Sequence, residues 1–151
     1  MSSELDNEND NNNNIKMIRK LIEEALEARE NAYAPYSKFK VGAALLTKEG
    51  KIYRGCNIEN AAYSPSICAE RTAISSAISK GDKDFTHIAI IAGNIDKGIK
   101  DYISPCGVCR QVLLEFCDKK NFKVILAKDV NTYKILTLEE LMPYSFGADE
   151  L

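Results

Sequence analysis

The sequence predicts a single α/β domain of three layers, in which helices cover both faces of one mixed five-stranded sheet. Three observations lead to this fold class. A chain of 151 residues has the length of one domain and can bury about 68–70% of its unfolded surface. Segments with helical periodicity alternate with short strand-like segments. The continuous apolar run from Thr86 to Ala92 is typical of a strand buried on both faces.

The N-terminal segment, residues 1–14, consists almost entirely of Asn, Asp, Glu and Ser. Such a composition cannot offset the entropy that is lost on ordering, so we expect a disordered Asn-rich tail. From residue 15 to about residue 31, apolar residues recur at helical spacing opposite a charged face. This pattern predicts an amphipathic helix that packs on the sheet, and the folded domain is therefore expected to cover residues 15–151.

The later elements follow from apolar runs, turn residues and helix caps. Ser66 and Ser104 are the expected N-caps of the two middle helices, and Pro105 suits the first helical position of the second. In chain order we expect strands at 39–47 and 51–57, a helix at about 67–80, a strand at 86–92, a helix at about 105–118, strands at 123–127 and 133–136, a short helix at 137–141 and an irregular tail at 144–151.

Composition and charge exclude several classes of function. The formal net charge is -2, so nothing suggests nucleic acid or an anionic membrane as a partner, and a small ligand fits better. The chain has no apolar run of membrane-spanning length and no basic-then-apolar leader, and we expect a cytoplasmic protein. Five cysteines, an odd number, then favour reduced thiols and metal binding over disulfides.

The most informative stretch is residues 104–111, Ser-Pro-Cys-Gly-Val-Cys-Arg-Gln. Cys106 and Cys109 fall in the first turn of a predicted helix, where the helix dipole and unpaired N–H groups favour thiolates. They are three residues apart and therefore share one face. Such a pair supplies half of a tetrahedral metal site and needs at least one more ligand.

The best candidate for the third ligand is Cys68, which opens Cys68-Ala69-Glu70-Arg71 at the start of another predicted helix. Three protein ligands leave one position for water, and Glu70 can reach that water without being a ligand. Three thiolates carry more negative charge than Zn²⁺ neutralises, which makes the water less acidic and a nearby base more necessary. Glu70 is that base, and positioned proton transfer is worth about 10²- to 10⁴-fold in rate.

Simpler interpretations of these residues stay open. Cys56 or Cys117 could complete a structural four-cysteine zinc site, although both are more typical of small buried apolar residues. His87, the only histidine, stands near the start of the buried strand, where packing is the commoner role. A hydrolase that needs a Cys-His pair would depend on that single residue.

Five motifs in order resemble the cytidine deaminase family, specifically its small homotetrameric zinc-dependent branch. They lie at residues 36–44, 55–61, 68–70, 105–109 and 143–147. The resemblance implies a cytidine deaminase-like fold, one Zn²⁺ per chain and a homotetramer with shared active sites. It also implies hydrolytic deamination of cytidine and 2'-deoxycytidine to uridine and 2'-deoxyuridine with release of ammonia, a reaction of pyrimidine salvage.

The resemblance assigns roles residue by residue. Cys68, Cys106 and Cys109 would bind zinc, and Glu70 would move protons between water, ring N3 and the leaving amine. Arg71 and Gln111 would support the thiolates. The residues that would contact the substrate are Phe39, Asn57, Glu59 and Ala69 of one chain and Phe146 of a neighbouring chain.

Three other functions remain possible at this stage. The first is deamination of a nucleoside antibiotic such as blasticidin S on the same fold, against which the Asn57 and Glu59 pair argues. The second is an editing deaminase that acts on polynucleotides, for which a basic groove is missing. The third is a zinc-stabilised binding module without catalysis, against which Glu70 argues.

Overall fold

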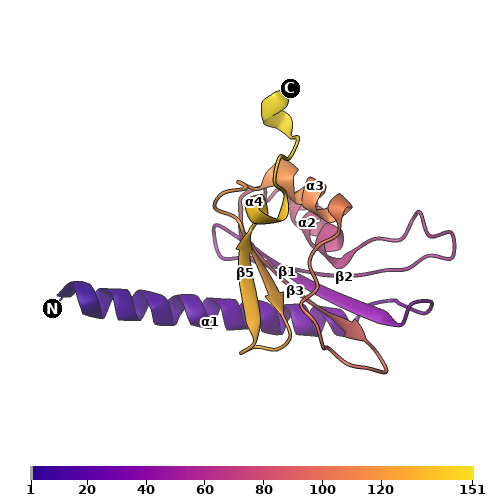
Figure 1. Ribbon diagram of the computed structural model, residues 1–151, viewed down its shortest axis with the longest axis horizontal. Helices are drawn as coiled ribbons and strands as arrows, with labels where there is room; N and C mark the ends of the chain where they lie inside the picture. The colour runs from indigo at the N-terminus through magenta and orange to yellow at the C-terminus, as the bar shows by residue number, and fades with distance from the viewer. Residues whose placement is uncertain (1) are drawn as a thin grey trace.

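The computed structural model describes residues 2–151 of the chain and the side chains of residues 9–151. One five-stranded sheet has the order β2-β1-β3-β4-β5, and only β3 and β4 run parallel. The mixed sheet with helices on its faces confirms the predicted fold class (Figure 1). The strands are β1 (Phe39–Thr47), β2 (Ile52–Cys56), β3 (Phe85–Asn94), β4 (Lys123–Ala127) and β5 (Tyr133–Thr137).

The helices divide the core into two layers. Helix α1 (Ser2–Glu30) covers one face and buries side chains such as Leu21 and Ile22 against the sheet. Helices α2 (Ala69–Ser79), α3 (Gly107–Phe116) and α4 (Leu138–Leu141) lie on the other face. Strand β3 contributes to both layers because successive side chains of a strand point to opposite faces, as Ile90 and Ile91 do. None of the helices within residues 2–151 has the length and apolar character needed to cross a membrane.

Helix α1 begins earlier than the sequence predicts. It starts at Ser2, so the segment for which we expect disorder is helical in the structure, while Met1 lies outside the described residues. The side chains of residues 9–14 are all exposed, which agrees with a segment that buries nothing. Once a packed helix exists, each added residue gains one backbone hydrogen bond, and helical geometry extends beyond the packed part.

Two helices start two residues later than the sequence predicts. Cys68 is the N-cap of α2 and Cys106 is the N-cap of α3, in place of Ser66 and Ser104. The Ser66 hydroxyl instead accepts a hydrogen bond from the N–H of Asn60 in the preceding loop. Cys68 and Cys106 therefore stand at the positive ends of these two helices, at the N-cap and not within the first turn.

Two glycines let helices approach the sheet closely. A Cβ atom at Gly55 of β2 would lie 2.2 Å from the carbonyl oxygen of Ala69 and 2.5 Å from the nitrogen of Ala73. On the other face, a Cβ atom at Gly42 of β1 would lie 1.9 Å from the carbonyl oxygen of Ala25. The first turn of α2 therefore rests directly on β2, next to the loop that follows this strand.

Candidate active site

Three thiols from two helix N-termini lie together. The Sγ atoms of Cys68 and Cys106 are 3.9 Å apart, those of Cys106 and Cys109 are 3.5 Å apart, and all three lie within 4.8 Å of one another. Four-coordinate zinc with Zn–S bonds of about 2.3 Å requires sulfurs about 3.8 Å apart, so the donor set fits this metal. Within the part of the chain whose side chains are described, this is the one cluster of its kind.

The surroundings of the thiols favour thiolate chemistry. Cys106 Sγ accepts a hydrogen bond from the backbone N–H of Cys109 at 3.5 Å. The thiol of Cys109, and then the guanidinium of Arg71, lower the pKa of Cys68 to about 5. The pKa of Cys109 is raised, because its proton is shared with Cys68 and because it is buried.

Arg71 lies beside this cluster. Its Nη2 atom is 3.9 Å from Cys68 Sγ and 3.4 Å from the carbonyl oxygen of Ser66. Its Nε–H is buried and has no hydrogen-bond partner in the chain. A positive charge held at this distance offsets part of the negative charge that three thiolates carry.

Glu70 is the buried carboxylate of the site. It is 5% exposed, and this burial raises its pKa to about 7, with repulsion by Cys68 as a smaller cause. It lines a cavity of about 260 Å³ together with Cys68 and Cys106. Carboxylates are buried in proteins where a partner or a function holds them there, and this one lines the same cavity as two of the three thiols.

Asn57 lines the same cavity but already has partners. Its Oδ1 atom accepts the N–H of Val41 and its Nδ2 donates to the carbonyl oxygen of Phe39, both at 2.8 Å. The amide thus continues the pairing of β2 with β1 beyond the end of the strand. One N–H and one lone pair of the amide stay free for a ligand.

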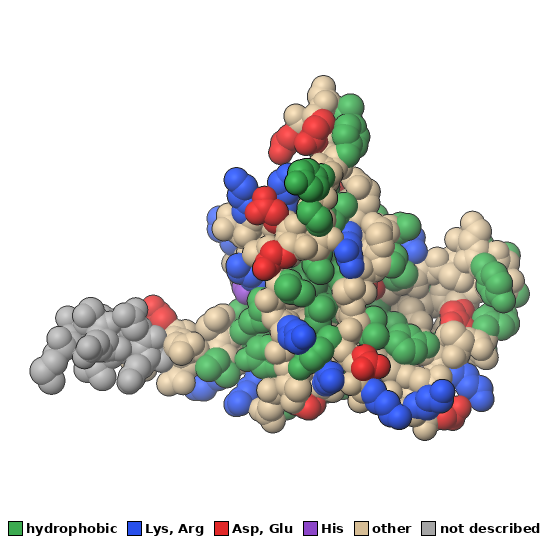
Figure 2. All heavy atoms as spheres, in the orientation of Figure 1, with side chains coloured by type: hydrophobic (Ala, Val, Ile, Leu, Met, Phe, Trp, Pro, Cys, Tyr) green, Lys and Arg blue, Asp and Glu red, His purple; other side chains and the backbone are tan. Residues whose placement is uncertain are grey.

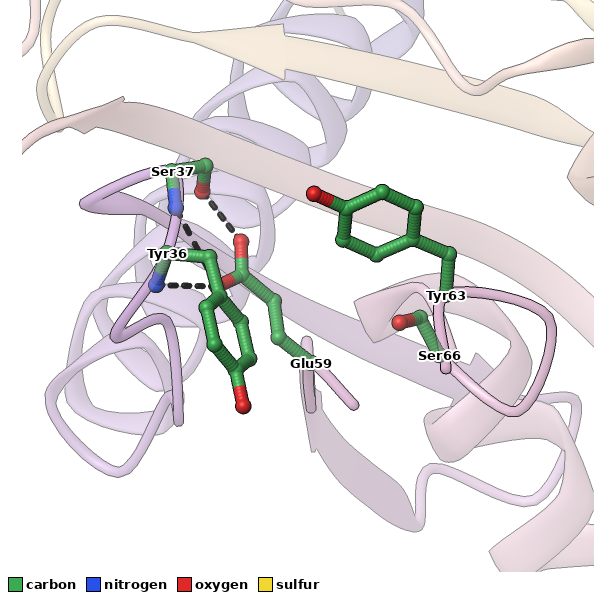
Figure 3. Close-up of a pocket in the computed structure, with 5 residues that line it drawn as sticks. All are labelled: Tyr36, Ser37, Glu59, Tyr63 and Ser66. Carbon is green, nitrogen blue, oxygen red and sulfur yellow. Dashed lines mark hydrogen bonds between the residues drawn. The ribbon is translucent and has the colours of Figure 1, made fainter. Parts of the chain in front are cut away.

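Glu59 joins this cavity to a second one of about 460 Å³. Its Oε2 atom accepts the N–H groups of Tyr36 at 2.9 Å and Ser37 at 3.3 Å, and its Oε1 accepts the Ser37 hydroxyl. Figure 3 shows these donors directed at the carboxylate, with Tyr63 and Ser66 on the other side of the cavity. These contacts, first the Ser37 hydroxyl, hold the pKa of Glu59 below its usual range.

Four residues that the resemblance assigns to the site do not line the cavity of Glu70 in the single chain. Phe39 lines a neighbouring hollow, and the side chain of Ala69 is fully buried. The Gln111 amide donates to the carbonyl oxygen of Phe146, and its support of the thiolates stays a prediction. Phe146 itself is 61% exposed. Figure 2 shows the C-terminal segment standing clear of the surface around it.

Sequence reasoning missed two residues that hold the site together. Arg110, next to Cys109, bonds to the carbonyl oxygens of Pro105 at 2.7 Å and Leu141 at 2.6 Å. Ser37 fastens Glu59 to the turn before β1. Their partners are backbone atoms or residues more than twenty positions away, which no local pattern reveals.

The remaining candidates lie outside the thiol cluster. Cys117 packs in the core, where burial raises its pKa to about 12, and burial also raises the pKa of Cys56. His87 is half-buried on β3, and its Nδ1 atom lies 2.9 Å from Thr86 Oγ1. These surroundings agree with a packing role. The positions of Cys56, Cys117 and His87 outside the thiol cluster therefore argue against a closed four-cysteine site and against a Cys-His pair.

The family model and the relatives that match this chain agree on one family. The model of the cytidine and deoxycytidylate deaminase zinc-binding region matches residues 15–125. Cytidine deaminase of Sporosarcina psychrophila is 46% identical over 134 residues, which span 89% of this chain and 94% of the relative. Cytidine deaminase of Halalkalibacterium halodurans is 47% identical over 131 residues, spanning 87% and 95%. Blasticidin-S deaminase of Bacillus cereus is less similar, at 34% over 130 residues, spanning 83% and 89%.

Solved structures agree with the sequence relatives. The crystal structure of cytidine deaminase from Burkholderia pseudomallei superposes with a TM-score of 0.75 at 43% identity and covers 84% of this chain and 97% of that one. The family model covers most of the chain, and the relatives match along nearly their whole length. The chain therefore belongs to the cytidine and deoxycytidylate deaminase family, whose zinc-binding region it contains.

Proposed function

We propose that this chain hydrolyses cytidine and 2'-deoxycytidine to uridine and 2'-deoxyuridine and releases ammonia. One observation carries the proposal: Cys68, Cys106 and the buried Glu70 line the same cavity as Asn57 and Glu59. Thiols with a carboxylate suit hydrolysis at a metal, and an amide with a carboxylate suits sugar hydroxyls because together they donate and accept. The similarity to cytidine deaminases supports the choice of substrate.

The protein residues divide the chemistry among them. Cys68, Cys106 and Cys109 would hold one Zn²⁺, which supplies water activation and charge stabilisation when bound. Glu70 accepts a proton from the attacking water and delivers it to ring N3. It then takes the proton of the new C4 hydroxyl and passes it to the amine, which leaves C4 as ammonia. Arg71 moderates the negative charge of the thiolates. Cytidine and water thus become uridine and ammonia with no other reactant.

We infer that the working enzyme is a homotetramer in which Phe146 stacks on the base in a neighbouring subunit. Phe146 is exposed and its segment projects from the body, so it has little to contact in its own chain. Tyr33, Tyr36 and Tyr63 are also exposed, and the latter two line the cavity beside Glu59. Exposed aromatics around a cavity are typical of an interface.

We further infer that residues 15–151 form the catalytic domain, because the family model begins at residue 15 and residues 9–14 are exposed. Thiol ligands need a reducing compartment, which supports a cytoplasmic enzyme. Neither inference requires a nucleic acid or a membrane as partner.

Substrate turnover tests the proposal directly. Zinc-loaded protein is assayed by absorbance with cytidine, 2'-deoxycytidine, cytidine monophosphate and blasticidin S. We expect turnover of the two nucleosides. Turnover of blasticidin S alone would identify an antibiotic deaminase, and no turnover of any compound would leave a non-catalytic binding module.

Metal ligation is tested independently of activity. We expect one zinc per chain, with three sulfurs and one light atom in the X-ray absorption spectrum. Four sulfurs around the metal would indicate a closed structural site and contradict the catalytic proposal.

A further inference from the structure

The carboxylate of Glu59 has an uneven set of partners. Its Oε2 atom accepts two backbone N–H groups, from Tyr36 and Ser37. Its Oε1 atom accepts one hydrogen bond, from the Ser37 hydroxyl. An ionised carboxylate offers about four acceptor positions, two on each oxygen. The position left for a ligand is therefore on Oε1, the oxygen that Ser37 holds.

The Ser37 hydroxyl has a fixed direction. Its Oγ atom accepts the N–H of Phe39 at 3.0 Å, which occupies a lone pair. A serine hydroxyl has a single proton, and here that proton is committed to Glu59. Figure 3 shows the hydroxyl and the two N–H groups converging on the carboxylate from one side, with the cavity on the other.

The frame around this contact is itself anchored. The N–H of Glu59 donates to the carbonyl oxygen of Tyr33 at 2.8 Å, and the N–H of Lys38 donates to that of Ala34 at 3.1 Å. Lys38 has φ of 55°, which closes the turn before β1. The backbone on both sides of the Ser37–Glu59 contact is thus fixed. Backbone N–H groups hold Oε2, and the Ser37 hydroxyl is the side-chain donor that holds Oε1.

We propose that Ser37 is a positioning residue that aims Glu59 Oε1 at one sugar hydroxyl and so makes the enzyme select nucleosides that carry it. This rests on the proposed function. Because one acceptor position remains on Oε1, it serves one hydroxyl at a time. Cytidine and 2'-deoxycytidine share the 3'- and 5'-hydroxyls, which excludes the 2'-hydroxyl, and we take the 3'-hydroxyl as the partner that the test below removes. A carboxylate kept ionised by its donors acts purely as an acceptor toward it.

The test compares nucleosides that differ by one hydroxyl. We measure kcat/KM of wild type and Ser37→Ala for cytidine, 2'-deoxycytidine and 3'-deoxycytidine. Ser37→Ala is expected to lower kcat/KM about five- to tenfold for the first two and to leave 3'-deoxycytidine unchanged, because a hydrogen bond to a charged group is weakened only where the hydroxyl is present. In a Glu59→Ala background, Ser37→Ala should have no further effect.

Two control variants separate positioning from structural support. Ser66 lines the same cavity, but its hydroxyl accepts from Asn60 N–H and makes no contact with Glu59, so Ser66→Ala should keep the wild-type selectivity. Ser37→Thr keeps the hydroxyl and should therefore show the selectivity of wild type. This variant also gives an answer if Ser37→Ala folds poorly.

Two results would overturn the inference. One is unchanged selectivity in Ser37→Ala, whether kcat/KM falls equally for all three nucleosides or stays the same, and the other is failure of Ser37→Thr to restore selectivity. A wild-type protein that turns over no nucleoside would instead contradict the proposed function. The two failures are therefore distinct.

Discussion

Glu70 stands out among the side chains for its burial. In the described part of the chain, the buried polar or charged side chains are those of Thr47 and Glu70. Burying a carboxyl group costs free energy unless it has a partner, and most carboxylates stay at the surface for this reason. The position of Glu70, two residues after Cys68 and facing the cavity, is explained by chemistry and not by stability.

Replacing Glu70 tests that explanation. Glu70→Gln keeps the size and most of the hydrogen bonding but removes the proton carrier. Turnover of cytidine should fall by at least about 10²-fold, while bound zinc and the thermal unfolding midpoint stay at or above wild type. Glu139→Gln, a change of an exposed carboxylate on α4, is the control and should leave turnover unchanged. Near-normal turnover of Glu70→Gln would rule out its role in proton transfer.

The stability of the fold depends on pH through His87. Burial, with repulsion by Lys123 as the second cause, lowers the pKa of His87 below 6.5. The unfolded chain then binds a proton more readily than the folded one, so stability is complete above about pH 6.5 and falls as the pH is lowered through the folded pKa. His87→Gln removes this contribution. Its unfolding midpoint should decline less between pH 7 and pH 5 than that of wild type, and parallel curves would show that His87 contributes nothing.

Helices α3 and α4 are tied together by Arg110. The guanidinium reaches the carbonyl oxygen of Leu141 at the end of α4, the carbonyl oxygen of Pro105, and the hydroxyl of Ser104 at 3.0 Å. The last carbonyls of a helix have no partner within the helix, and Arg110 supplies one. The segment that carries Cys106 is thereby fastened to the helix that leads into the C-terminal tail.

Arg110→Ala should loosen the metal site through this segment. We expect zinc transfer to a competing chelator to become about 10- to 100-fold more favourable, the usual effect of removing a group that orients a metal ligand. Arg29→Ala is a matched control, because Arg29 also holds two carbonyl oxygens, of Lys40 at 3.2 Å and Gly93 at 2.9 Å, beside α1. Both variants should lower the unfolding midpoint, and equal zinc retention in both would contradict a special role for Arg110.

The assembled molecule can be tested through its C-terminal segment. Truncation after Tyr144 removes Phe146, and an aromatic side chain that stacks on a base contributes about 1–3 kcal/mol. The truncated chain should bind zinc normally but show a raised KM or no turnover. Mixing it with a Glu70→Gln chain should restore part of the activity, because each chain supplies the half of a shared site that the other lacks.

Two outcomes would contradict this shared-site prediction. One is full activity of the truncated chain, and the other is activity of the full-length chain as a dilute monomer in analytical ultracentrifugation. A mixture of Glu70→Gln with zinc-free Cys106→Ala chains is the control, since both changes fall in the same half of the site and no activity should return.

The sequence predicts those features that depend on local order. Strands β1 and β4 have the bounds that their apolar runs predict, and the spacing of Cys106 and Cys109 indicates a thiol pair on one helix. The predicted cap positions are wrong because both hydroxyls have other partners. That of Ser66 accepts the N–H of Asn60 in the same loop, and that of Ser104 accepts from Arg110. The bonds of Asn57 to the backbone of β1 could not be predicted either, because they exist only after distant segments have met.

The missing side chain at Gly55 has a consequence for changing what the enzyme accepts. Helix α2 already touches the backbone of β2 there, so the thiol cluster and the loop that carries Asn57 and Glu59 are as close as they can be. Any side chain at Gly55 would drive them apart. A redesign that aims at bulkier or smaller nucleosides therefore has to change the loops that line the cavity, which contribute Ser66 and Ile103 and lie outside the helices and strands.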